Sequence, residues 1–150
     1  YGDRVDTVDT VEYLLQLYPE SINVRDSEGK LPIHNAALGG NAKTIALLLE
    51  HDPDAASKKT EDENEDEEAY EQLPLHIAIC AVEHTDIISY DPKTIQVLYD
   101  AYPEAINIRD GYGEAPLDIA REEDMEELCL NLCFKLKKHL QKISLKILLN

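Results

Sequence analysis

The stretch Leu73-Pro74-Leu75-His76-Ile77-Ala78 decides the fold, because close copies of it occur twice more in the chain. The copies are Leu31-Pro32-Ile33-His34-Asn35-Ala36 and Ala115-Pro116-Leu117-Asp118-Ile119-Ala120, spaced 42 residues apart. A second phrase alternates with the first: Tyr18-Pro19-Glu20-Ser21-Ile22-Asn23-Val24-Arg25-Asp26 and Tyr102-Pro103-Glu104-Ala105-Ile106-Asn107-Ile108-Arg109-Asp110, with a weaker copy at Asp52-Pro53-Asp54-Ala55-Ala56. Two phrases in alternation predict a repeat protein whose units pack on their neighbours.

Each unit is predicted to contain two helices. Pro32 suits the first turn of a helix, where its missing N–H would be unsatisfied anyway. Gly39-Gly40-Asn41 predicts a break, and the apolar spacing predicts a second helix over residues 42–50. The turn Asp26-Ser27-Glu28-Gly29 places Gly29 where a positive φ is needed.

The first helix, expected over residues 6–18, has no partner helix before it in the sequence. In a repeat protein it is the second half of a unit whose first half is missing or degenerate, and we expect the chain to be a fragment. Its apolar face is therefore expected to be exposed or covered by residues outside the fragment.

Leu-Pro-Leu-His-Ile-Ala, followed by a Gly-rich break and a Leu-rich helix, resembles the ankyrin repeat family. The resemblance covers roughly residues 7–127 and implies an all-α fold, an ankyrin-type α-solenoid of stacked helix-turn-helix repeats. Asp118 departs from the family, which has His at that position. The family unit is about 33 residues, so the spacing of 42 indicates insertions.

The insertions and phrases together predict four segments. A partial first repeat spans residues 1–30 with a second helix and a turn. The second repeat spans 31–72 with an acidic loop insertion at 61–70, and the third spans 73–114 with an inter-helix insertion at 82–92. The terminal repeat spans 115–150 and includes an extended basic amphipathic helix.

Charge is distributed unevenly along the chain. The formal net charge is −17, yet residues 1–127 hold all 31 acids and nine of the 14 Lys and Arg residues. An array this acidic disfavours nucleic acid and anionic membranes as partners and favours basic proteins. Three cysteines predict free thiols in a reducing, intracellular compartment, cytoplasmic or nuclear. No apolar run reaches the ~18 residues of a membrane span.

The acidic insertion has seven acids among residues 61–68, which predicts a mobile loop. One interpretation is a solvated insertion without function; the other is electrostatic capture of a basic partner. A calcium loop is disfavoured because Glu67 replaces the required Gly and Leu73 falls where the bidentate Glu belongs.

The end of the chain predicts a long C-terminal capping helix. An apolar seam runs along it with a lysine-rich flank, the seam being Cys129, Cys133, Leu136, Leu140, Ile143 and Ile147. Pairing with a partner helix is an alternative, and membrane contact is disfavoured except through this helix. This helix could instead dock on the acidic array and make the module a self-regulated switch.

The function predicted is a protein–protein interaction module, a monomer without catalytic activity, cofactor or metal. Resemblance implies that His34 and His76 hydrogen-bond turn backbone and neighbouring repeats, and no ligand or nucleophile stands at suitable spacing beside them. The residues expected to be structural are His34, His76, Asp118, Pro32, Pro74 and Pro116. The residues expected to bind a partner are Arg25, Asp26, Glu28, Lys30, Glu61, Asp62, Glu63, Glu65, Asp66, Glu67, Glu68, Arg109, Asp110, Tyr112 and Glu114.

Overall fold

In this computed structural model, residues 7–61, 71–84, 91, 93–122, 138 and 141 are described. Every regular element among these residues is a helix, which confirms the predicted all-α class. The elements are, in chain order, α1 Thr7–Leu17, η1 Pro19–Asn23, α2 Pro32–Leu38, α3 Ala42–His51, η2 Ala55–Ser57, α4 Pro74–His84, α5 Lys93–Ala101, η3 Pro103–Asn107 and α6 Pro116–Glu122, where η marks a short 3₁₀ helix.

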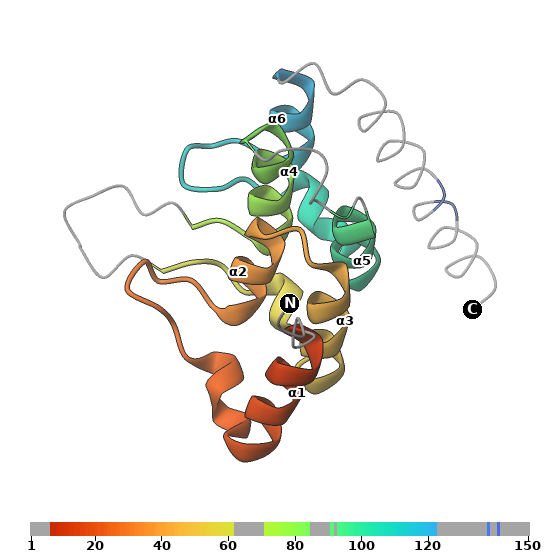
Figure 1. Ribbon diagram of the computed structural model, residues 1–150. Helices are drawn as coiled ribbons and strands as arrows, with labels where there is room; N and C mark the ends of the chain where they lie inside the picture. The colour runs from red at the N-terminus through yellow and green to blue at the C-terminus, as the bar shows by residue number, and fades with distance from the viewer. Residues whose placement is uncertain are drawn as a thin grey trace, which may run out of the picture.

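The helices form two rows (Figure 1). In the inner row α2 packs against α4, and α4 packs against α6; in the outer row α1 packs against α3, and α3 against α5. The rows are joined within each unit, since α2 also packs on α3 and α4 on α5. This is the stacked arrangement of a solenoid, in which each unit buries its apolar side against its neighbours.

The repeated six-residue phrase builds the inner row. Its proline stands at the first position of each inner helix, where no N–H is lost from the helical ladder. The residues around it are buried: Leu31 and Leu73 precede the helices, and Ile33 and Leu75 follow the prolines. Full burial of such a side chain stabilises the fold by about 2 kcal/mol.

Breaks between the helices of a unit are made in two ways. In the second unit Gly40 has a φ of +64°, and the Asn41 side chain accepts a hydrogen bond from the Thr44 N–H at 3.1 Å. In the third unit α4 continues through His84, so residues 82–84 of the predicted insertion extend the helix. Asp91 stands before α5, and its N–H donates to the Gly40 carbonyl at 3.1 Å.

The second phrase does more than end the outer helices. Within each full copy, five residues form a short 3₁₀ helix, η1 or η3, that begins at the proline. Its isoleucine, Ile22 or Ile106, points into the core. The sequence predicted that the first helix ends at residue 18 but did not predict this short helix.

Three hairpins connect the units, and they project to the same side of the stack (Figure 1). The first is formed by residues 24–30, the second by residues 58–61 with 71–72, and the third by residues 108–114. Residues 62–70 of the acidic insertion lie outside the described residues, as do residues 85–90. The predicted capping helix also lies outside them, except for Lys138 and Gln141, which are helical.

Candidate protein-interaction site

Each of the three hairpins is closed by an equivalent pair of residues that exchange two hydrogen bonds. The N–H of Asp26 donates to the Lys30 carbonyl at 2.9 Å, and the Lys30 N–H returns to an Asp26 carboxylate oxygen at 3.0 Å. Asp110 and Glu114 repeat both bonds in the third hairpin. These exchanges satisfy backbone groups that a tight turn would otherwise leave unpaired.

In the second hairpin the closing pair is Thr60 with Gln72. The Thr60 N–H donates to the Gln72 carbonyl at 2.9 Å, and the Gln72 N–H donates to the Thr60 hydroxyl at 2.9 Å. The acidic insertion therefore lies between the two residues of a closing pair. The base of this longer hairpin has the same hydrogen-bonding pattern as its shorter neighbours.

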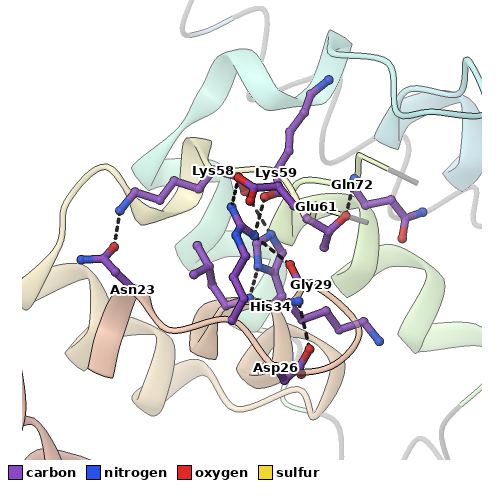
Figure 2. A network of polar contacts seen from close by, with 12 residues as sticks. Asn23, Asp26, Gly29, His34, Lys58, Lys59, Glu61 and Gln72 are labelled. Carbon is purple, nitrogen blue, oxygen red and sulfur yellow. Dashed lines mark hydrogen bonds and ion pairs between the residues drawn. The ribbon is translucent and has the colours of Figure 1, made fainter. Parts of the chain in front are cut away.

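The first hairpin holds the entry of the acidic insertion (Figure 2). The Arg25 guanidinium donates to the carbonyls of Gly29 at 2.7 Å and Lys59 at 3.0 Å, and forms an ion pair with Glu61 at 2.6 Å. The Glu61 N–H donates to the Gly29 carbonyl at 3.1 Å. A Cβ on Gly29, whose φ is +69°, would overlap the Glu61 carbonyl, so only glycine permits this approach.

Further contacts hold both sides of the second hairpin. Lys58 reaches back to the Asp52 carboxylate at 2.5 Å and the Asn23 amide oxygen at 2.7 Å, and Lys59 pairs with Glu71 at 2.9 Å. At the exit, the Gln72 side chain donates to the Asp110 carboxylate of the third hairpin at 3.1 Å. Both ends of the insertion are thus joined to neighbouring repeats.

His34 lies beneath the second hairpin and is fully buried. Its Nδ1 accepts the Leu31 N–H at 3.0 Å, so the neutral ring carries its proton on Nε2, which donates to the Lys58 carbonyl at 3.0 Å. Burial lowers the pKa of His34 from 6.5 to about 4. A charged ring would also lose the acceptor that Leu31 uses.

His76 makes the equivalent contacts one repeat later. Its Nδ1 accepts the Leu73 N–H at 3.2 Å, and its Nε2 faces the Glu114 carbonyl at 3.2 Å. Burial lowers its pKa as well. In the terminal repeat an Asp118 oxygen takes the place of Nδ1, 3.4 Å from the Ala115 N–H, and also lies 3.3 Å from Arg109.

The residues expected to bind a partner fall into two groups. Four of them are occupied in building hairpins: Arg25, Asp26, Arg109 and Asp110. The Asp26 carboxylate accepts the Asn35 amide at 2.7 Å as well as two backbone N–H groups, and these bonds lower its pKa. Arg109 bonds the Gly113 carbonyl within its own hairpin.

The other expected residues lie nearer the hairpin tips. Glu28 and Tyr112 are exposed, Lys30 and Glu114 are partly exposed, and Lys30 pairs with Glu28. Glu61 is the only expected acid of the insertion within the described residues; Asp62, Glu63, Glu65, Asp66, Glu67 and Glu68 lie outside them. The structure brings Arg25 and Glu61 together. The first and third hairpins lie on either side of the base of the second hairpin (Figure 1).

Sequence reasoning missed the residues that hold the second hairpin, namely Lys58, Lys59, Thr60 and Gln72. A signal for them exists, because Lys58-Lys59-Thr60 stands at the place of Val24-Arg25-Asp26 and Ile108-Arg109-Asp110 in the repeat. In this alignment Thr60 stands at the position of Asp26 and Asp110, which identifies it as the residue that closes the second hairpin.

Neither a metal site nor a membrane span is found in this part of the protein. No group of three His, Cys, Asp or Glu residues suited to a metal ion occurs among the described residues. None of the helices in the same ranges is long and apolar enough to cross a membrane.

Comparison with known proteins identifies the repeat. The sequence matches the family model for ankyrin repeats (3 copies) over residues 4–90, which is more than half of the chain. No curated protein sequence matches the chain. The family match and the all-helical stack agree with the resemblance in the repeated phrases.

Proposed function

Because the chain belongs to the ankyrin repeat family, whose repeats are generally protein–protein interaction modules and typically non-catalytic scaffolds, we propose that it binds a protein partner with a basic surface. The contact is made by the acidic insertion together with the exposed tips of the flanking hairpins. The observation that carries the proposal is the fixed base of the insertion: Glu61 is held by the first hairpin and Gln72 by the third.

Charge at the base supports a basic partner. The cations of the second hairpin region are already paired, Arg25 with Glu61, Lys58 with Asp52 and Lys59 with Glu71. Six more acids follow in residues 62–68. They add negative charge that these three cations do not balance, and such charge attracts a basic surface and speeds its association.

The hairpins contribute shape as well as charge. Arg25, Asp26, Arg109 and Asp110 hold the turns closed, so their role in the proposal is to position the tips. Tyr112 is 55% exposed at the third tip, and tyrosine supplies apolar contact area with a polar end, as interface residues commonly do. The partner surface we propose is therefore cationic with an apolar element.

The test changes charge without changing chain length. In one variant the six acids of residues 62–68 become their amides. A matched control converts six exposed acids elsewhere to amides: Asp9, Glu12, Glu20, Glu50, Asp54 and Asp100. Proteins captured from a native cell lysate are compared among the two variants and the unaltered chain, at low and moderate salt.

Loss of a captured protein with the first variant, but not with the control, supports the proposal. Equal capture by all three chains contradicts it. Thermal unfolding of each variant shows whether the stack is intact. The predicted switch, in which the lysine-rich C-terminal segment docks on the acidic array, remains a prediction from sequence because that segment lies almost wholly outside the described residues.

A further inference from the structure

The second hairpin carries a glutamate at a position where the other two hairpins carry glycine. The residue directly before the second member of the closing pair is Gly29 in the first hairpin, Glu71 in the second and Gly113 in the third. Their φ angles are +69°, +36° and +84°. Glu71 is the one residue other than glycine with a positive φ in the described part of the chain. A side chain is strained in this backbone conformation, whereas glycine adopts it freely.

The glutamate changes the contact that the neighbouring cation makes. In the first and third hairpins, Arg25 and Arg109 donate to the carbonyl of the glycine. Lys59 stands at the same place in the repeat, but its ammonium pairs with the Glu71 carboxylate at 2.9 Å. The Glu71 side chain is 54% exposed, and an ion pair this exposed stabilises a fold little. Folding alone therefore does not explain a glutamate at this position.

Strained backbone is found mainly where it serves binding or catalysis. We propose that the Glu71 carboxylate binds an arginine side chain of the protein partner, and that Lys59 occupies this carboxylate in the free protein. The inference rests on the proposed function, because it adds one residue and one partner group to the same site. Glu71 lies at the exit of the acidic insertion, directly before Gln72 of the closing pair.

Arginine is the partner side chain that can displace a lysine here. A guanidinium donates two parallel hydrogen bonds to the two oxygens of a carboxylate, whereas an ammonium acts as a point charge. Lys59 is also held weakly, since its ammonium contacts only Glu71 among the described residues. The exchange therefore breaks one exposed ion pair and forms a stronger one.

The other two cations at the base of the insertion are held too firmly for such an exchange. Arg25 donates to two backbone carbonyls in addition to its ion pair with Glu61. Lys58 bridges a carboxylate and an amide oxygen. Glu71 is thus the acid at the base whose cation a partner can replace without opening the hairpins.

Binding of a fluorescent octa-arginine peptide to the full chain tests the proposal, at a salt concentration of about 0.15 M. Glu71→Gln removes the charge and keeps the strain, and Glu71→Gly removes both. The matched control is Glu50→Gln, which removes an exposed acid of α3. We expect both Glu71 variants to raise the dissociation constant about fivefold and the control to raise it less than about twofold.

Thermal unfolding of the same variants separates binding from folding. Glu71→Gly should melt about 3 °C above Glu71→Gln, because both lack the ion pair and only the glycine relieves the strain. A chain that binds less while melting higher has not lost its affinity through unfolding. A lower midpoint for Glu71→Gly than for Glu71→Gln overturns the proposal.

Lys59→Gln tests whether Lys59 competes with the peptide. We expect this change to tighten binding about threefold in the unaltered chain and less in the Glu71→Gln chain, where no carboxylate is left to compete for. The control Lys43→Gln removes an exposed cation of α3 and should have the same small effect in both chains. Equal gains from Lys59→Gln in both chains overturn the proposal.

The peptide also distinguishes failure of this inference from failure of the proposed function. If Glu71→Gln binds as the unaltered chain does, while the variant with six amides in residues 62–68 binds less, the role of Glu71 is overturned and the proposed function stands. If the unaltered chain does not bind the peptide, both are overturned.

Discussion

Arg25 of the first hairpin and Arg109 of the third stand at the same place in the same phrase, yet 24% of the Arg25 side chain is exposed and 67% of the Arg109 side chain. Arg109 bonds the Gly113 carbonyl of its own hairpin and Asp118 of α6, the helix that follows that hairpin. Arg25 bonds its own turn and also the next one, at Lys59 and Glu61. The sequence of a hairpin sets its internal shape, and its place in the stack decides whether it also holds a neighbour.

Gly29 and Gly113 give the strongest test of this difference. Both have positive φ, so Ala at either position costs about 1 kcal/mol or more in backbone strain. Only Gly29→Ala also drives a Cβ into the Glu61 carbonyl. We expect Gly29→Ala to lower the free energy of unfolding by about 3 kcal/mol and Gly113→Ala by about 1 kcal/mol.

Urea denaturation of the two alanine variants measures this. Similar losses at the two positions would mean that the contact between the first hairpin and the acidic insertion contributes little in solution.

His34 and Asp118 extend the comparison to the helices, because they stand at the same position of the repeated phrase and only the first of them is a buried imidazole. Unfolded His34 titrates at 6.5 and folded His34 at about 4, so between these values the unfolded chain binds more protons and stability falls as the pH falls. We expect His34 to contribute a loss of about 2 kcal/mol from pH 7 to pH 5.

The His34→Gln variant should lose that share of the pH dependence. Exposed His51 provides the control, and His51→Gln should keep the dependence of the unaltered chain. Unfolding free energies measured by denaturant at several pH values give the slopes. If the unfolding free energy of the His34→Gln chain depended on pH as steeply as that of the His51→Gln chain, the buried His34 ring would not be the source of the pH dependence.

Removal of the two arginines is expected to have the smallest effects. Arg25→Ala removes hydrogen bonds to two carbonyls and an ion pair, and should cost about 1 kcal/mol. Arg109→Ala removes mainly exposed contacts and should cost about 0.5 kcal/mol or less.

Hydrogen exchange tests the contact between Arg25 and the acidic insertion directly, which a change in overall stability does not. Arg25→Ala should raise the exchange rate of the Glu61 amide, which donates to Gly29, while Arg109→Ala leaves it unchanged. Equal exchange rates of that amide in both variants would mean that Arg25 does not position the insertion.

The fold could be predicted from sequence because its signals are local and repeated. The Pro32 phrase identifies an inner helix, Gly29 identifies a positive φ, and the repeat of both identifies a stack. The positive φ of Gly29 is confirmed at +69°. These features depend on side chains within a few positions of one another, so one copy predicts the next.

The candidate site was less predictable because its contacts cross between repeats. Arg25 meets Glu61 over 36 positions, and Gln72 meets Asp110 over 38. Such pairings depend on how one hairpin lies on the next, which periodicity does not specify. Arg25 and Asp26 were predicted as contact residues from position alone, and that contact stays a prediction; the hydrogen bonds by which they hold the hairpins were not predicted.

The closing pair of Thr60 and Gln72 separates the length of the second hairpin from the architecture of the stack. Whatever stands between its two members, the chain leaves one repeat and enters the next through the same pair of bonds. The entropic cost of closing a loop grows only slowly with the length of the loop. A foreign peptide inserted between Thr60 and Gln72 should therefore leave the stack intact. Residues 62–70 are free to change in sequence and length during evolution, while the repeats on either side are constrained by packing.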